Sequence, residues 1–287
     1  MTKFDHPPLR SLIRSLRSQF ANWMTLGALS FVVLQSRCPP REGWPRLGQL
    51  LRVKVRLRNQ LRARCRLNEF AGFVEVWVYR EYDVPGLRWD EVRTIVDVGA
   101  NVGAATLWFA TRAPQARIVA VEPARDAVSS LTANVEANGL SDRVQVVPAG
   151  LGATSGIGYL APAADSACTT VGTHVTEPEL RVPVKSLRDL LEEMAIEELD
   201  LLKLDCEGAE FEILLSSKTL LPSIRAIVGE FHATQIEPRR QLEEILVGSG
   251  FDCHFLGGED FGLFAAVRVG SRASRATAFH ASRHARG

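Results

Sequence analysis

Hydrophobic and polar residues follow two different periods along most of the chain. Short apolar runs predict buried strands, and longer amphipathic segments between them predict helices. The expected strands are Thr94–Val98, Arg117–Val121, Arg143–Val147, Leu199–Leu204 and Ile224–Phe231. The expected helices are Ala104–Ala113, Ala124–Asn138, Ser186–Ala195, Ala209–Lys218 and Gln235–Val247. Strands that alternate with helices indicate an α/β protein with a doubly wound, mostly parallel sheet.

Two segments depart from this alternation. Phe251–Phe255 and Phe261–Val267 flank Gly257-Gly258, which predicts a closing antiparallel hairpin. Residues 149–185 are rich in Gly, Ala, Ser and Thr and follow the third strand. A loop there lies at the carboxyl ends of the strands, where open α/β sheets bind ligands. We therefore expect a substrate lid or small hairpin, with a surface insertion as the alternative.

The region before residue 70 has a different pattern. Leu51–Leu57 alternates apolar and cationic residues, which predicts a half-buried strand, and Phe73–Tyr79 alternates less regularly and is expected to pair with it. Phe20–Leu34 is apolar but shorter than the roughly 20 residues that span a bilayer, so we expect a buried or surface-lying helix rather than a signal peptide. We divide the chain into an N-terminal extension (1–69), a main domain (70–269) and a disordered tail (270–287).

The charges are distributed unevenly. Residues 1–93 hold 17 Lys/Arg against 8 Asp/Glu, whereas residues 94–270 hold 13 against 25. Seven cations lie within residues 52–66, a density that attracts acidic membranes, nucleic acid or phosphorylated glycans. The residues between them are aliphatic, so base stacking is not expected. The alternative is an ordinary solvated strand face.

The five cysteines are odd in number, far apart and without a C-x-x-C pair. This spacing favours neither a zinc site nor a disulfide framework. Reduced thiols are typical of a cytoplasmic protein.

The residues after the first strand carry the main binding signal. Gly99 and Gly103 allow the backbone to approach a ligand closely, and the helix that follows offers free N–H groups. A dinucleotide site has G-x-G-x-x-G at this point, and Asn101 replaces the middle Gly that admits a pyrophosphate. The pattern therefore favours another adenosine cofactor over a nicotinamide dinucleotide.

Two acids and one backbone segment extend this site. Glu122 ends the second strand, where a carboxylate accepts hydrogen bonds from ribose hydroxyls. Asp97 places an acid near the amino-acid portion of S-adenosylmethionine, whose sulfonium tolerates acids, although Asp97 could instead cap the turn. The expected contact for adenine is the backbone at Ala149, just after the third strand, or Asp142, just before it.

Taken together, the motifs resemble the FkbM-like methyltransferases. The resemblance covers about residues 70–256 and rests on Asp97–Gly103, Val121-Glu122-Pro123, Leu131–Asn134 with Asn138, Leu201–Glu210 and Glu230-Phe231-His232. It implies a Rossmann-like class I methyltransferase fold. It also implies methyl transfer from S-adenosylmethionine, usually to a hydroxyl of a sugar, glycolipid or polyketide.

The acceptor side should lie at the ends of the fourth and fifth strands. An alcohol needs a base within hydrogen-bond reach, because it holds its proton at neutral pH. The candidate catalytic residues are Lys203, Asp205, Glu207, Glu230 and His232. Lys203 lies in an apolar run and needs a partner, so a structural ion pair is the alternative for it and for Glu210. These oxygens and the His could hold a divalent cation, but their spacing requires none, and we predict no metal site.

The sequence thus predicts an S-adenosylmethionine-dependent O-methyltransferase acting on a sugar, glycolipid or secondary metabolite. Its expected partner is a small-molecule, carbohydrate or lipid-linked acceptor, with no sequence-specific nucleic acid and with weak peripheral membrane contact through the basic N-terminal region. The segment after the fourth strand lacks the Asp/Asn-Pro-Pro-aromatic motif of DNA adenine methylation. The alternatives are a nicotinamide oxidoreductase and a non-catalytic methyltransferase-like module.

Overall fold

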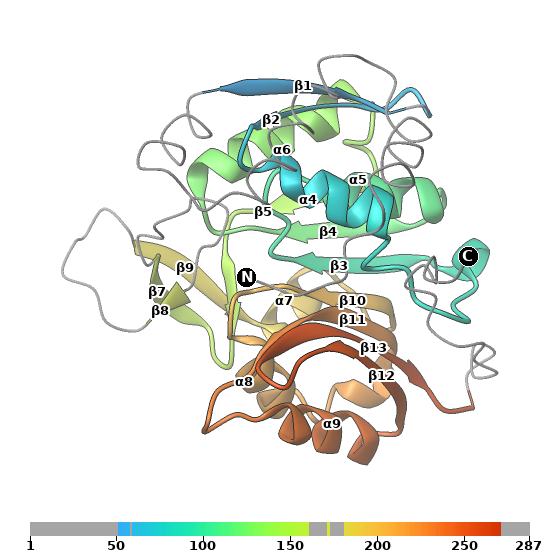
Figure 1. The fold of residues 1–287 in the computed structure, drawn as a ribbon, viewed down its shortest axis with the longest axis vertical. Helices are drawn as coiled ribbons and strands as arrows, with labels where there is room; N and C mark the ends of the chain where they lie inside the picture. Colours follow the sequence, from blue (N-terminus) through green and yellow to red (C-terminus); the bar gives the residue numbers. More distant parts are fainter. Residues whose placement is uncertain (1–50, 58, 161–170, 173–180, 271–287) are drawn as a thin grey trace, which may run out of the picture.

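The computed structural model describes residues 51–57, 59–160, 171–172 and 181–270, so the segments expected at Phe20–Leu34 and 271–287 lie outside it. A seven-stranded sheet with the order β12-β13-β11-β10-β3-β4-β5 forms its centre (Figure 1). The parallel strands are β3 (Thr94–Val98), β4 (Arg117–Val121), β5 (Val144–Val147), β10 (Leu199–Leu204) and β11 (Ile224–His232), and the antiparallel strands are β12 (Phe251–Gly257) and β13 (Phe261–Arg268). The expected sheet with its closing hairpin is confirmed.

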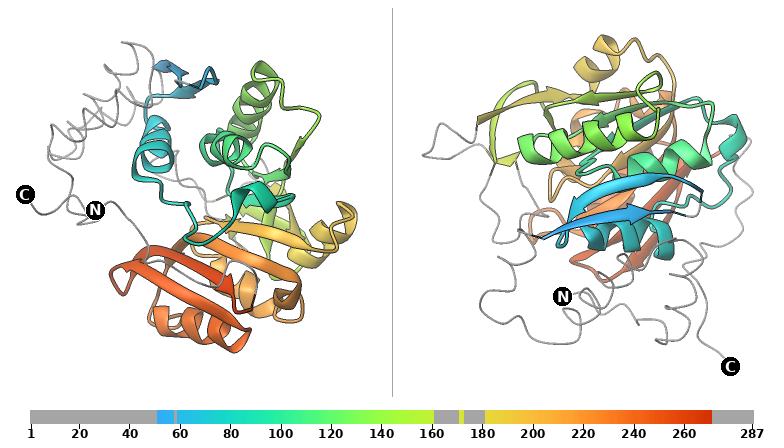
Figure 2. Two further views of the ribbon diagram at one scale, coloured as in Figure 1. Left: turned by 90° about the vertical axis from the view of Figure 1, so that its right-hand side faces the viewer. Right: turned by 90° about the horizontal axis from the view of Figure 1, so that it is seen from above.

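Helices cover both faces of this sheet (Figures 1 and 2). One face packs against α4 (Phe70–Val74), α5 (Ala104–Arg112) and α6 (Arg125–Ala137), and the other against α7 (Leu187–Glu193), α8 (Glu210–Ser216) and α9 (Arg239–Gly248). Neighbouring strand residues point to opposite faces, so Ile95 belongs to the first core and Val96 to the second. No helix in the described part of the chain is long and apolar enough to cross a bilayer.

The helix predicted from Gln235 begins four residues later. Pro238 occupies the N-cap of α9, with extended backbone angles of φ −72° and ψ 153°. A proline has no N–H for a preceding helical turn, so a helix readily starts just after it. The residues before Pro238 form a turn, in which the Thr234 side chain accepts a hydrogen bond from the Glu237 N–H at 3.0 Å.

The N-terminal strands form a separate antiparallel hairpin of β1 (Arg52–Arg56) and β2 (Arg62–Arg66). Val53 and Val55 are buried and the cations of β1 are exposed, so the predicted alternation is confirmed there. Leu51 departs from it, because it is 46% exposed just before β1 begins.

The predicted pairing of Leu51–Leu57 with Phe73–Tyr79 is wrong. β1 pairs with β2, and Phe73–Tyr79 is helical, ending α4 and forming the π-helical segment η1 (Glu75–Tyr79). The helix places Phe70, Phe73 and Trp77 on one buried face, at the spacing that α-helical geometry requires. Burying these large rings outweighs the strand preference of the valines between them.

Asn134 of α6 and Asn138, which caps the C-terminal end of that helix, attach the hairpin to α6. The Asn134 Oδ1 accepts from the Arg64 N–H at 2.8 Å, and its Nδ2 donates to the Arg64 carbonyl at 3.0 Å. Asn138 repeats both bonds with Arg62, at 2.8 and 2.7 Å. Four residues of helix rise about 6.0 Å and two residues of strand about 6.6 Å, so the two pairs match in spacing. The Asn134 Nδ2 also donates to Val102 at 2.8 Å, which connects the hairpin to the loop after β3.

The predicted insertion contains a small second sheet with the order β6-β9-β7-β8. Its strands are β6 (Gly150–Gly152), β7 (Gly156–Leu160), β8 (Val171–Gly172) and β9 (Arg181–Ser186). β9 leads into α7, where the Ser186 hydroxyl accepts from the Asp189 N–H at 3.1 Å and so caps the helix. Residues 161–170 and 173–180 of the insertion lie outside the described structure, and a role as a lid stays a prediction.

Candidate active site

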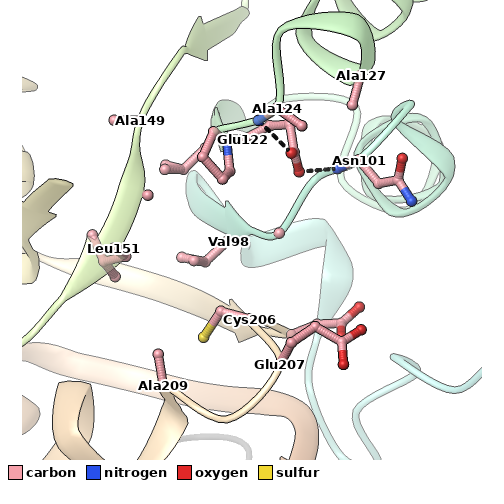
Figure 3. A pocket seen from close by; sticks show the side chains of 15 residues that line it. Val98, Asn101, Glu122, Ala124, Ala127, Ala149, Leu151, Cys206, Glu207 and Ala209 are labelled. Atoms are coloured by element: carbon pink, nitrogen blue, oxygen red, sulfur yellow. Dashed lines mark hydrogen bonds between the residues drawn. The ribbon is translucent and has the colours of Figure 1, made fainter. Parts of the chain in front are cut away.

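A pocket lies where β3, β4 and β10 end. Its walls come from four segments: the loop after β3, the turn before α6, the residues after β5 and the loop after β10. Figure 3 shows Asn101 and Glu122 on one side of it and Cys206, Glu207 and Ala209 on the other. The site therefore lies at the carboxyl edge of the parallel sheet, as the sequence predicts.

Gly99 allows the loop after β3 to pass close to the end of β10. Its φ is +71°, and a Cβ at this position would lie 1.8 Å from the Asp205 carbonyl oxygen. Its N–H and that of Ala100 donate to the Val121 carbonyl, each at 3.0 Å. The loop is therefore held between the two neighbouring strands, with its backbone exposed toward the pocket.

Two further loop residues adopt left-handed conformations. Asn101 has φ +48° and lines the pocket. Gly103 has φ +94° and packs against Leu131, whose Cδ1 would lie 2.7 Å from an added Cβ. Gly103 thus permits the close contact of α5 and α6 and does not itself line the pocket.

Glu122 is fixed in the pocket wall by backbone donors. Its Oε2 accepts from the Asn101 N–H and its Oε1 from the Ala124 N–H, both at 2.9 Å (Figure 3). The residue is 6% exposed. Burial raises the pKa of Glu122 above its usual range, and the two N–H groups together with the charge of Lys203 act against that rise. Glu122 therefore lines the pocket, and its expected contact with ribose hydroxyls stays a prediction.

The remaining walls on this side are small or apolar. They comprise Val98, Val121, Pro123, Ala124, Ala127, Ala149, Gly150 and Leu151. Ala149 lines the pocket as predicted, whereas Asp142, the alternative contact, does not. Short side chains here leave room for a flat apolar ring beside a carboxylate.

Behind the loop lies a buried ion pair. Lys203 of β10 and Asp97 of β3 are 1% and 0% exposed, and the Lys203 Nζ lies 3.2 Å from the Asp97 Oδ1. The Thr106 hydroxyl donates to the other Asp97 oxygen at 2.6 Å. Lys203 also donates to the carbonyls of Val98 at 3.0 Å and Gly99 at 2.8 Å. Asp97 and Lys203 therefore hold the loop in place from within the sheet and do not line the pocket.

The Lys203 ammonium keeps its charge in this position. Burial alone would lower the pKa of Lys203, but the carboxylates of Asp97 and then Asp205 raise it above the ordinary value. A permanently protonated, buried lysine is not available as a base.

Asp205 lines the pocket just beyond β10 and is oriented by two groups. The Lys203 Nζ lies 3.3 Å from its Oδ2, and the Tyr82 hydroxyl donates to the same oxygen at 2.8 Å. The Tyr82 ring is buried, with its centroid 5.1 Å from the Lys203 Nζ. Both contacts use Oδ2, so Oδ1 is the oxygen of Asp205 that they leave for another partner.

Three glutamates surround Asp205 electrostatically. Burial first, and then Asp205, Glu81 and Glu75, raise the pKa of Glu230 to about 10. Burial and Asp205 raise the pKa of Glu75 to about 7, and burial with Glu75 and Asp205 raises the pKa of Glu81 well above its usual range. Neighbouring like charges favour protonation of some members, so Glu230, with a pKa of about 10, holds a proton at neutral pH. Protonated carboxyls donate hydrogen bonds.

The loop after β10 is held by Glu210. This buried carboxylate accepts from the N–H groups of Cys206 and Gly208, each at 3.0 Å. Glu207 between them has φ +56°, a conformation that costs a non-glycine residue about 1–2 kcal/mol. Its Oε2 lies 3.3 Å from the His232 Nε2, and the His232 Nδ1 lies 3.6 Å from the Glu210 Oε1.

The pKa of His232 lies above that of an ordinary histidine. Burial would lower its pKa, but the hydrogen bond and charge of Glu210, with the charge of Glu207, raise it. The His232 ring therefore lies between these two glutamates, next to the pocket rather than in its wall.

This geometry agrees with a comparison to known families. The family described as "Methyltransferase FkbM domain" matches residues 97–255, which is more than half of the chain. The chain belongs to the FkbM methyltransferase family. The match begins at the buried acid of β3 and ends in β12, so it contains the pocket and most of the sheet.

Individual relatives of this FkbM methyltransferase are distant. It is 28% identical to methyltransferase sdnD of Sordaria araneosa over 213 residues, covering 63% of this chain and 81% of that protein. It is 29% identical to the hexuronic acid methyltransferase AglP of Haloferax volcanii over 170 residues, covering 55% of this chain and 67% of that protein. A crystal structure of the methyltransferase FkbM of Methylobacillus flagellatus KT aligns with a TM-score of 0.44 and 11% identity, covering 70% of this chain and about half (54%) of that one.

The predicted site residues of this FkbM methyltransferase fall into two groups. Those that line the pocket are Gly99, Asn101, Glu122, Ala149, Asp205 and Glu207. Those that lie behind or beside it are Asp97, Gly103, Lys203, Glu230 and His232. Within the described ranges, no three or more His, Cys, Asp or Glu residues are grouped as a metal would require.

Sequence reasoning missed Glu75, Glu81 and Tyr82, which the structure brings next to Asp205. The acids are visible in the sequence, but Tyr82 and Asp205 are 123 residues apart. No local pattern connects them, because the contact depends on α4 and η1 packing beside α5.

The raised carboxyl pKa values predict that stability falls with pH. A carboxyl whose pKa rises from 4.5 to about 10 on folding binds more protons in the folded chain, so stability decreases as pH rises through that window. Glu230→Gln should therefore raise the melting temperature by about 3 °C or more at pH 8 and leave it unchanged near pH 4. Calorimetric melts across this range measure the difference, with the exposed Glu243→Gln as control. An equal effect at both pH values would contradict the electrostatic cause.

Proposed function

We propose that this chain transfers a methyl group from S-adenosylmethionine to a hydroxyl oxygen of an uncharged small molecule, such as a sugar or a secondary metabolite. The observation that carries this proposal is the charge of the pocket wall. Its acidic members are Glu122, Asp205 and Glu207, and no Lys or Arg side chain belongs to the described lining. Such a wall suits a cationic sulfonium and opposes the pyrophosphate of a nicotinamide cofactor.

The residues present fit S-adenosylmethionine. Each oxygen of Glu122 accepts one backbone N–H and keeps further lone pairs for the ribose hydroxyls. The alanines and Gly150 leave space for adenine against Val98 and Leu151. The exposed backbone of the loop around Gly99 and Asn101 would hold the amino-acid portion.

The chemistry needs an aligned nucleophile and a base. When bound, S-adenosylmethionine supplies a methyl carbon, whose bond to sulfur breaks as the bond to the acceptor oxygen forms. We assign Asp205 as the base that takes the hydroxyl proton, because it lines the pocket and Lys203 and Tyr82 fix its orientation. Lys203 and Tyr82 act as positioning residues.

The same acids select the acceptor by charge. Asp205 and Glu207 line the pocket where the acceptor is expected. An acceptor that carries a carboxylate or phosphate would be repelled by these acids and lose affinity. A neutral polyol meets no such repulsion and can donate its hydroxyl hydrogens to them. We therefore propose an uncharged acceptor, unlike the hexuronic acid named for the Haloferax volcanii relative.

Calorimetric titration tests the cofactor assignment. The protein should bind S-adenosylmethionine and S-adenosylhomocysteine, and bind the nicotinamide dinucleotides at least about 100-fold more weakly. Glu122→Ala should weaken S-adenosylhomocysteine binding by about 10- to 100-fold, because each lost charge-assisted hydrogen bond contributes about 1.5–3 kcal/mol. Glu136→Ala, an exposed acid of α6, is the matched control. Unchanged affinity in Glu122→Ala, or tight nicotinamide binding, would refute the assignment.

A further inference from the structure

The outward face of the β1–β2 hairpin consists entirely of cations. These are Arg52, Lys54, Arg56, Arg62, Arg64 and Arg66. The strand register places them opposite one another as three like-charged pairs, Arg52 with Arg66, Lys54 with Arg64 and Arg56 with Arg62. Like charges directly opposite in an antiparallel pair destabilise it. This basic face therefore opposes the formation of the hairpin that carries it.

Within the described ranges, few of these cations have an acidic partner that would offset their mutual repulsion. Arg66 pairs with Asp126 and Glu69. The side chains of Arg52, Arg56, Arg62 and Arg64 form no ion pair with any residue in the described ranges. Cations elsewhere on the surface do, such as Arg225 with Glu91 at 3.0 Å and Arg240 with Glu244 at 2.7 Å.

The fold does not need these cations to hold the hairpin. The inward side chains Val53, Val55, Ala63 and Cys65 are buried against the core shared with α6. Asn134 and Asn138 bond to the backbone of β2, so any side chain at positions 62 and 64 would satisfy them. An external anionic partner would explain why six cations are placed together.

We propose that the outward face of the β1–β2 hairpin docks on an anionic lipid bilayer. The inward side chains of the hairpin pack in the core and the open edge of β2 lies along α6, so its six cations share one outward surface at the end of the molecule (Figures 1 and 2). A major groove about 12 Å wide admits a two-stranded ribbon, but here α6 lies along the open edge of β2 and makes the element wider than that groove. Binding single strands without sequence preference relies on aromatic platforms. This face has no aromatic residue.

The negative charge of the rest of the chain also favours a flat bilayer over a flexible polyanion as the partner. Residues 94–270 hold 25 Asp/Glu against 13 Lys/Arg, so a polyanion that wrapped around the body would be repelled. A bilayer touches only the basic face. Arg66 pairs with Asp126 at the start of α6, close to Ala124 and Ala127 of the pocket wall, so the bilayer would lie near that side of the pocket. The inference uses no residue assigned to catalysis and does not depend on the proposed reaction.

Vesicle sedimentation tests the docking. The protein should bind vesicles of equal parts phosphatidylserine and phosphatidylcholine at low salt, bind phosphatidylcholine vesicles negligibly, and dissociate as salt rises. The triple variant R56Q/R62Q/R64Q should bind the anionic vesicles about 100-fold more weakly, at roughly fivefold per cation, and Arg62→Gln alone about fivefold. The melting temperature of the triple variant should equal or exceed that of the parent, because repulsion between like charges is removed.

The control changes the same charge elsewhere. R188Q/K218Q/R240Q removes three exposed cations from α7, the turn after α8 and α9, which cover the opposite face of the sheet. It should bind anionic vesicles as the parent does. Equal binding to neutral vesicles, retained binding in the hairpin variant, equal loss in both triple variants, or tighter binding to duplex DNA or RNA at the same salt would overturn the proposal.

Discussion

Asp205→Asn should lower the turnover number by roughly 100- to 10,000-fold, the usual contribution of a positioned general base. Affinity for S-adenosylhomocysteine should stay within about threefold, because Glu122 and the loop after β3 are unchanged. The amide keeps the size of the side chain and an oxygen for the Tyr82 hydroxyl, which donates to Asp205 at 2.8 Å. Single-turnover assays with the best available acceptor, together with calorimetric titration, separate the two effects.

The control for this variant is Asp252→Asn, an exposed acid on β12. It should leave both quantities unchanged. Alanine variants of Glu207, Glu230 and His232 measured beside Asp205→Asn identify any second group that moves the proton. Full turnover in all four would refute the placement of the acceptor at this end of the pocket. Lost turnover accompanied by a lower melting temperature and weaker cofactor binding would indicate a structural role for Asp205.

Lys203→Met should destabilise the protein by about 3–5 kcal/mol, the cost of leaving a buried charge without its partner. Asp97 is 0% exposed and would lose its cation, and the carbonyls of Val98 and Gly99 would lose a donor. The melting temperature should fall by about 10 °C. Urea unfolding followed by circular dichroism measures the change.

The double variant Asp97→Asn with Lys203→Met should recover part of this loss, since the unpaired charge is removed. Lys218→Met, at an exposed position, is the matched control and should change stability by less than about 0.5 kcal/mol. Unchanged stability of Lys203→Met would contradict the structural role of the buried ion pair.

The sheet was predictable because its strands are buried on both faces. β3 and β10 have the predicted bounds, since largely apolar segments between polar residues leave little choice of ends. Phe73–Tyr79 was mispredicted because the segment carries both periods, a strand-like alternation and a helical spacing of Phe70, Phe73 and Trp77. Only the tertiary burial of these rings decides between the two.

The pocket was predictable where the residues belong to short contiguous motifs. Glu122 and the loop from Gly99 to Gly103 follow directly from strand ends and glycine positions. Only part of the acceptor side could be predicted from the sequence. Glu75, Glu81 and Tyr82 approach Asp205 from a segment that precedes the first central strand, and no local motif indicates this. Lys203 was recognised as needing a partner, but its main partner, Asp97, comes from the neighbouring strand and had been expected at the cofactor.

The amides of Asn134 and Asn138 also bear on aggregation. A two-stranded hairpin has two open edges, and each open edge can accept a strand from another molecule. In this protein β1 occupies one edge of β2, and the two amides satisfy the N–H and carbonyl groups of Arg62 and Arg64 on the other. In the described structure, α6 therefore blocks strand addition at β2. The protection of this edge depends on side chains 70 and 76 residues further along the chain, and not on the strand's own sequence.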